Sequence, residues 1–138
     1  MEPGTIVGAT FVAMSAMLCV LLWIPYIGAR AFVVWGLADF LKNYTEGFPA
    51  ESPPEPLWAV RAHRAHLNLV ETLPAFVGVV WAATAVGAVA AVATWAPVFF
   101  WSRVVHAGVY IAGVPYLRTP VYLVSWFAVL MIGAGALG

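Results

Sequence analysis

Three long stretches of the 138-residue chain contain no charged side chain, at residues 3–29, 72–102 and 119–138. A helix of about 20 apolar residues crosses the hydrocarbon core of a bilayer, so each stretch is long enough for at least one span. The composition agrees, because 64% of the residues are hydrophobic and only 9% are charged. Soluble domains carry about a quarter charged residues. The sequence therefore predicts an integral membrane protein.

The first apolar stretch is predicted to be a membrane helix over about residues 5–38. Thr5 is suited to cap its start, and Pro25 is expected to kink it. No basic segment precedes it and no small-residue cleavage site follows a short apolar core, which argues against a cleavable signal peptide. The single cysteine, Cys19, lies within this span, so no disulfide can form inside one chain.

Prolines, glycines and polar residues divide the rest of the chain. Residues 39–56 contain four prolines and several charges, which predicts a solvent-exposed loop. We place the remaining turns at Thr94–Pro97 and at Gly113–Tyr116. The resulting prediction is an all-α, up-down four-helix membrane bundle forming a single domain over residues 1–138, with helices at about 5–38, 57–92, 97–113 and 119–137.

The basic residues predict the orientation. Arg30, Lys42, Arg61 and Arg64 flank the first connection and Arg118 lies at the third, whereas the termini and the second turn carry none. Positive residues favour the cytoplasmic side. We therefore expect the first and third connections in the cytoplasm and both termini outside.

The segment 61–76 concentrates polar residues in an otherwise apolar chain. On a helix, Arg61, Arg64, Asn68 and Glu71 are spaced by 3, 4 and 3 residues and form one polar stripe. Ionisable side chains inside a membrane are expensive and face a bundle interior or a cavity. The stripe is therefore the first candidate for a functional site.

A second polar set lies in the third predicted helix. Arg103, His106 and Tyr110 are spaced by 3 and 4 residues and share one face, and Arg118 follows the next turn. Arginine forks suit carboxylates, and Glu71 could hold an ammonium group. Together the two sets predict a pocket for a small zwitterionic ligand, open sideways to an apolar co-substrate from the bilayer.

These residues resemble a known family. The run Arg64-Ala65-His66-x-Asn68-x-x-Glu71, then Arg103-x-x-His106-x-x-x-Tyr110 and Leu117-Arg118-x-Pro120, is similar to the pattern of the MAPEG proteins, the membrane-associated proteins in eicosanoid and glutathione metabolism, here of a bacterial type. The resemblance covers nearly the whole chain. It implies a homotrimer of four-helix protomers in a bacterial inner membrane, with glutathione as co-substrate bound between protomers and a lipophilic molecule or lipid entering from the membrane.

By the same resemblance, the activity is that of a glutathione-dependent transferase or peroxidase acting on lipophilic electrophiles. A guanidinium near the sulfur lowers the thiol pKa from about 8.5 and stabilises the attacking thiolate. No metal is required. The candidate catalytic residue is Arg118, and the candidate substrate-binding residues are Arg30, Arg64, His66, Asn68, Glu71, Arg103, His106, Tyr110 and Tyr122.

The sequence departs from the family pattern in places. In prostaglandin E synthase members the residue after the motif histidine is basic and the residue after the asparagine is acidic, whereas here both are leucines, Leu67 and Leu69. Strict alignment with that subgroup puts Tyr122 at the position of the thiol-activating arginine. A turn that varies by a residue or two puts Arg118 there.

Other interpretations use the same residues. A non-catalytic lipid-binding or scaffold protein on this fold is the main alternative, and a small-cation transporter with Glu71 as the coupling carboxylate is another. Glu71, Arg64 and Arg103 could form a purely structural ion-pair network. His63, His66 and His106 lack the ligand cluster of a haem or metal site. The tryptophans are typical of an interface belt and core.

Overall fold

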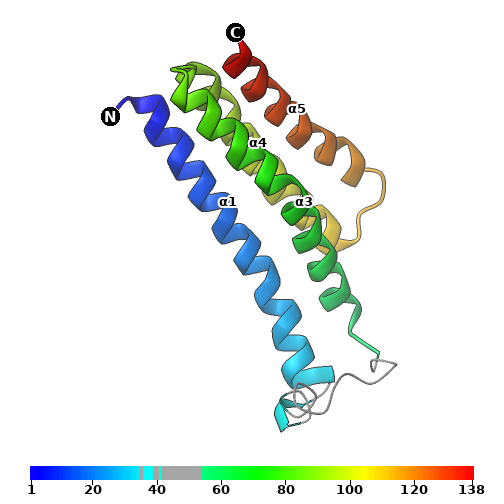
Figure 1. Cartoon of the computed structure of the whole chain (residues 1–138). Helices are drawn as coiled ribbons and strands as arrows, with labels where there is room; N and C mark the ends of the chain where they lie inside the picture. Colours follow the sequence, from blue (N-terminus) through cyan, green and yellow to red (C-terminus); the bar gives the residue numbers. More distant parts are fainter. Residues whose placement is uncertain (35, 39–40, 42–53) are drawn as a thin grey trace.

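The computed structural model describes residues 1–34, 36–38, 41 and 54–138. Within these residues the chain is an all-α bundle with no strand, which confirms the predicted fold class. Figure 1 shows both termini at the end of the bundle that carries the α3–α4 turn, and the connection from α4 to α5 towards the opposite end. The elements are α1 (Pro3–Gly28), η1 (Ala29–Val34), α3 (Leu57–Ala85), α4 (Val89–Ala112) and α5 (Arg118–Leu137).

Three helical segments of the described chain are long and apolar enough to cross a membrane, namely Pro3–Val34, Leu57–Ala85 and Arg118–Leu137. Helix α4 has 24 residues and packs against the other three long helices. It carries three buried polar residues, Ser102, Arg103 and His106. Since polar groups within membrane bundles turn inward, α4 belongs inside the bundle.

The turn between α3 and α4 differs from the sequence prediction. It lies at residues 86–88, whereas Thr94–Pro97 lie inside α4. Gly87 has φ +83, and paired bonds run from its N–H to the Thr84 carbonyl and from the Ala88 N–H to the Ala83 carbonyl. This is a Schellman motif, which glycine favours. The prediction was wrong because it relied on Pro97, and proline is tolerated inside membrane helices when neighbouring helices support them.

The helix starts also differ in detail. Helix α1 begins with Pro3 in its first turn after Glu2, so Thr5 lies inside the helix and does not cap it. The fourth helix was predicted to start at about residue 119, and α5 begins one residue earlier, at Arg118. The α-helical geometry of the first helix ends at Gly28 and continues as the π-helix η1. The predicted loop at 39–56 lies mostly outside the described residues.

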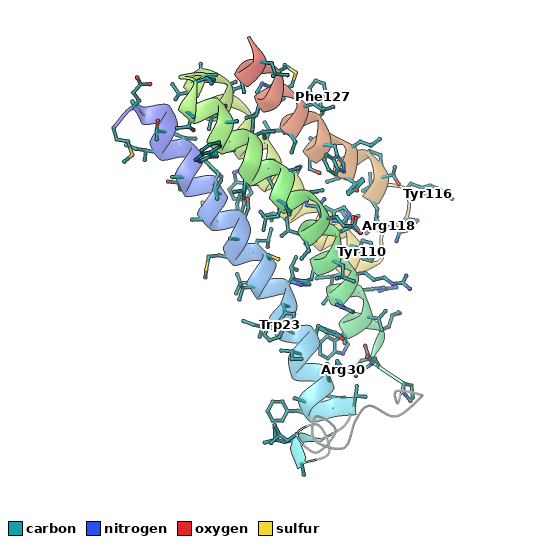
Figure 2. All side chains as sticks on the ribbon, viewed as in Figure 1. Trp23, Arg30, Tyr110, Tyr116, Arg118 and Phe127 are labelled. Carbon is teal, nitrogen blue, oxygen red and sulfur yellow. The ribbon has the colours of Figure 1, made fainter. Side chains whose placement is uncertain are left out.

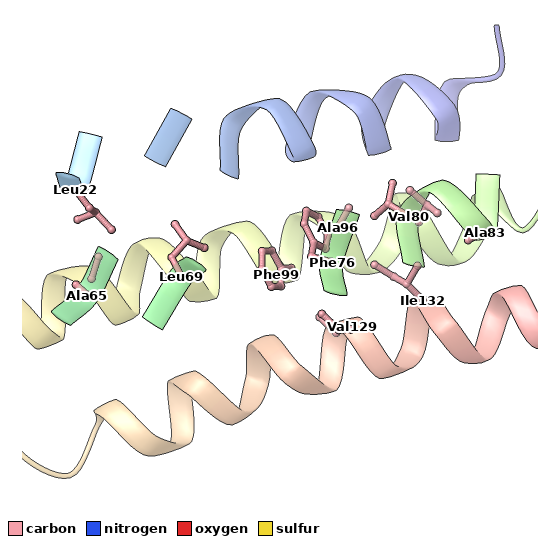
Figure 3. Packing of buried hydrophobic residues seen from close by; sticks show 13 residues of the cluster. Leu22, Ala65, Leu69, Phe76, Val80, Ala83, Ala96, Phe99, Val129 and Ile132 are labelled. Atoms are coloured by element: carbon pink, nitrogen blue, oxygen red, sulfur yellow. The ribbon is translucent and has the colours of Figure 1, made fainter. Parts of the chain in front are cut away.

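Aromatic stacking and small residues hold the long helices together. Phe76 of α3 and Phe99 of α4 stack with ring centroids 3.9 Å apart, and both are fully buried in the core cluster of Figure 3. Gly8 lies so close to α4 that a Cβ atom added there would be 2.6 Å from Cγ1 of Val92. Such close approach is typical of membrane helices, where packing drives association.

Candidate functional site

Two hollows open between α3, α4 and α5 near the end of the bundle opposite the termini. The larger, here called the arginine hollow, has a volume of about 330 Å³ and is lined by Leu57, Val60, Arg61, Arg64, Tyr110, Gly113, Val114, Pro115 and Arg118. The smaller, here called the tyrosine hollow, has about 180 Å³ and is lined by Asn68, His106, Tyr110, Arg118, Thr119 and Tyr122. Most of the predicted site residues therefore come together here.

Arg118 and Tyr110 line both hollows and mark where they meet. The Arg118 Cζ atom lies 4.9 Å from the centroid of the Tyr110 ring, and Figure 2 shows the two side chains close together between α3 and α5. At this distance the guanidinium is attracted to the face of the ring. The contact places a cation at the centre of the combined site without an acidic partner among the described residues.

The two candidates for the thiol-activating position lie on the same hollow. Arg118 and Tyr122 are one helical turn apart on α5, and both line the tyrosine hollow. Residues four apart on a helix are neighbours on its surface. The alignment choice between them therefore matters less than the sequence indicates, because either residue can reach a ligand in this hollow.

His106 and Arg103 form a buried layer behind the hollow. His106 lines the tyrosine hollow, and its ring centroid lies 5.6 Å from that of Tyr110 and 6.0 Å from that of Tyr122. Arg103 is 1% exposed, and its Cζ atom lies 5.6 Å from the Tyr122 ring. Its Nη1 donates to the Ser125 hydroxyl at 3.4 Å. Arg103 therefore contributes positive charge behind Tyr122 and does not line either hollow.

Arg61 is a site residue that the candidate set omitted. It lines the arginine hollow, and its Nη1 donates to the carbonyl of Ile111 at 3.4 Å. Its guanidinium packs on Gly113, where an added Cβ would be 2.7 Å from Cζ, and Gly113 has φ +73 at the end of α4. The polar stripe already contained Arg61 and could have identified it.

Three candidate residues lie elsewhere in the single chain. Arg30, in η1, forms an ion pair with Glu55 and lies far from Arg118 in Figure 2. His66 faces α1, where its Nδ1 lies 2.9 Å from the carbonyl oxygen of Cys19. Glu71 is exposed on α3 and lines neither hollow. Of the four residues in the polar stripe, Arg61, Arg64 and Asn68 therefore line a hollow, and Glu71 does not.

The ionisable residues of the site could also form an ion-pair network or a haem or metal site. The ion pair found among the described residues joins Arg30 and Glu55, and within these residues Glu71 forms no ion pair with Arg64 or Arg103. The three histidines have separate neighbours. His63 stacks on Tyr26 with ring centroids 3.7 Å apart, His66 meets Cys19, and His106 lies between two tyrosines.

The chemical content of the two hollows is a set of cations and hydrogen-bonding groups beside an apolar surface. The sequence was also compared with curated proteins and with profiles of protein families. A search among curated proteins found no match. The profile of the MAPEG family matches residues 6–138, nearly the whole chain. The chain therefore belongs to the MAPEG family.

Proposed function

We propose that this membrane protein binds glutathione in the tyrosine hollow and the adjoining part of the arginine hollow. It either joins glutathione through its sulfur to lipophilic electrophiles, or reduces lipophilic peroxides to alcohols and water while two glutathione molecules are oxidised to the disulfide. Membership of the MAPEG family supports the general type. The observation that carries the proposal is the position of Arg118, a guanidinium without an acidic partner among the described residues, at the meeting point of both hollows.

The hollows supply groups that suit the parts of glutathione. Arg64 and Arg118 can bind carboxylates through their planar forks. Asn68 offers an amide, and Tyr110 and Tyr122 offer hydroxyl groups. Small-molecule sites are concave pockets with a few placed polar groups, and their volumes start at about 300 Å³. The arginine hollow by itself has a volume of about 330 Å³, which is within this range.

Arg118 is assigned the catalytic role. A thiol loses its proton more readily beside a fixed cation, and the thiolate is the nucleophile. In conjugation the thiolate forms a C–S bond with the electrophilic carbon, and the displaced electron pair leaves with the leaving group or takes up a proton. Tyr122, one turn further on α5, can donate a hydrogen bond to the same sulfur. Arg103, behind Tyr122, adds positive charge to this side of the hollow.

Glu71 requires a neighbouring subunit in this proposal. Its carboxylate is exposed on a helix with the length and composition of a membrane span, and an ionised side chain facing lipid is costly. We infer that another protomer of a homotrimer covers this face of α3, so that Glu71 can meet the ammonium group of glutathione between subunits. The orientation proposed above, with this end of the bundle in the cytoplasm, gives glutathione access.

A non-catalytic lipid-binding protein on the same fold is the second candidate. An apolar groove of about 340 Å³ lies between α4 and α5, lined by Val98, Trp101, Ser102, Val105, Val121 and Val124. A groove of this composition suits an acyl chain. Under this function the groove would be occupied, while no thiolate would form in the hollows.

Titration of glutathione into the detergent-solubilised protein separates the two, with ultraviolet absorbance of the thiolate as the signal. We expect binding with a thiolate signal for the native protein, loss of the signal with retained binding for Arg118→Ala, and partial recovery for Arg118→Lys. Glu71→Gln should weaken binding and leave the signal at saturation. Binding without any thiolate signal in the native protein would favour the lipid-binding function.

A further inference from the structure

The arginine hollow has a lining that also suits a second ligand besides glutathione. Three arginines lie on it, and none of the described residues that line it is acidic. Much of the remaining wall is apolar, from Leu57, Val60, Val114 and Pro115. An ammonium group would find only cations here. The ligand that fits this wall carries an oxyanion joined to an apolar part.

The side chain of Arg61 is fixed in place on the wall of the hollow, where it can bind such an anion. Its Nη1 is bonded to the Ile111 carbonyl and its guanidinium packs on Gly113, so the side chain is anchored from the end of α4. A guanidinium has five N–H donors, and the structure uses one of them on Ile111. The remaining donors form a planar fork that matches phosphate. An anchored arginine loses less conformational freedom when an anion binds.

The hollow lies at the depth expected for lipid head groups. It is formed by the first turns of α3, from Leu57, and by the connection from Gly113 to Arg118, which is where the helices end. Trp58 beside it is 48% exposed, and exposed tryptophans are typical of the membrane interface. Basic pockets between membrane helices bind the head groups of anionic lipids.

We propose that the arginine hollow binds the phosphate group of an anionic phospholipid, with Arg61 as the residue that selects it. The glycerol and the start of the acyl chains lie against the apolar wall. Zwitterionic phospholipids bind less well, because their ammonium group meets three guanidinium groups. The proposal does not depend on glutathione binding. Since Arg64 and Arg118 serve both ligands, however, lipid and glutathione compete at this end of the site.

Native mass spectrometry of the delipidated protein in a neutral detergent tests the proposal, with dioleoyl phosphatidylglycerol and dioleoyl phosphatidylcholine as the probes. The two lipids share the same chains. We expect the phosphatidylglycerol to bind at least about fivefold more tightly, the factor that corresponds to about 1 kcal/mol for one arginine near the membrane surface. Arg61→Gln should remove about that factor for phosphatidylglycerol and change phosphatidylcholine binding less, because the lost phosphate contact is offset by weaker repulsion of the choline ammonium.

Arg30→Gln is the matched control, because it removes the same charge from η1, outside the hollow. An equal loss of phosphatidylglycerol binding in this variant would overturn the proposal in favour of diffuse attraction. Arg64 is exposed, so Arg64→Gln repeats the test if Arg61→Gln does not fold. Displacement of the lipid by inorganic phosphate at an equal concentration would show that the site takes free phosphate and would also overturn it. Asn68→Ala should weaken glutathione binding alone, which separates this proposal from the proposed function.

Discussion

Replacement of Arg103 by methionine is expected to stabilise the bundle. The guanidinium is 1% exposed, so its charge has lost nearly all of its hydration. Desolvation of a buried ion costs several kcal/mol. Three interactions partly offset this cost: one hydrogen bond to Ser125 at 3.4 Å, near the long limit for such bonds, the contact with the Tyr122 ring at 5.6 Å, and the Coulombic attraction of the Glu71 carboxylate. The Nε atom has no hydrogen-bond partner among the described residues.

The size of the effect follows from these contacts. A cation over an aromatic ring contributes about 0.5–2 kcal/mol, and a hydrogen bond this long contributes less than the usual 1.5–3 kcal/mol of a charged one. Buried charges replaced by apolar residues of similar volume have given gains of about 1–4 kcal/mol. We therefore expect Arg103→Met to raise the free energy of unfolding by about 1–3 kcal/mol.

Equilibrium unfolding in mixed micelles of a mild detergent and dodecyl sulfate, followed by circular dichroism, measures this change. Ser125→Ala is the control, since it removes the hydroxyl that accepts from Arg103 and donates to the Tyr122 carbonyl and leaves the guanidinium in place. Its effect should stay below about 1 kcal/mol. Glutathione affinity should fall in Arg103→Met, because the charge behind Tyr122 is lost. A decrease in stability of more than about 1 kcal/mol in Arg103→Met would refute the reasoning and point to a partner for the guanidinium in another subunit.

Three further changes test the packing and the site. Gly113→Ala should lower the unfolding free energy by about 1 kcal/mol or more, because φ +73 disfavours a Cβ and Arg61 occupies its space; Gly113→Asn, which tolerates this backbone, should be milder in the same thermal unfolding assay. Phe99→Ala should cost about 3–5 kcal/mol by loss of the stack with Phe76, and an effect below about 1 kcal/mol would contradict the core described here. Tyr122→Phe should reduce the glutathione thiolate signal in the ultraviolet titration and leave unfolding unchanged; an unchanged signal would remove Tyr122 from the site.

The sequence was sufficient to predict the class of fold, and most of the candidate site residues lie together in the structure. Charge-free stretches indicated membrane helices, and the helical spacing of Arg64 and Asn68 and of His106 and Tyr110 placed each pair on a common face. These residues do line the hollows. Spacing along one helix carried this information because helical geometry is local.

What the sequence could not show depended on contacts between helices. His66 belongs to the same motif as Asn68, yet it turns to the carbonyl of Cys19 on α1. Arg103 shares a face with His106, yet it is covered by α5 at Ser125. The α3–α4 turn was predicted at Thr94–Pro97, but the chain turns at Gly87, and Pro97 is accommodated inside α4. Which neighbour covers a polar side chain is set by packing, and helical spacing does not report it.

The short turn around Gly87 is the pivot about which the crossing angle of α3 and α4 changes. Asn68 lies 17 residues before the end of α3, which is about 26 Å along the axis at 1.5 Å per residue. A change of 5° in the crossing angle at the pivot would shift the tips by about 2 Å, enough to break hydrogen bonds to a bound molecule. The rings of Phe76 and Phe99 stack between the pivot and Asn68. Their contact sets the distance between α3 and α4, and with it the separation of the two helices at the hollows.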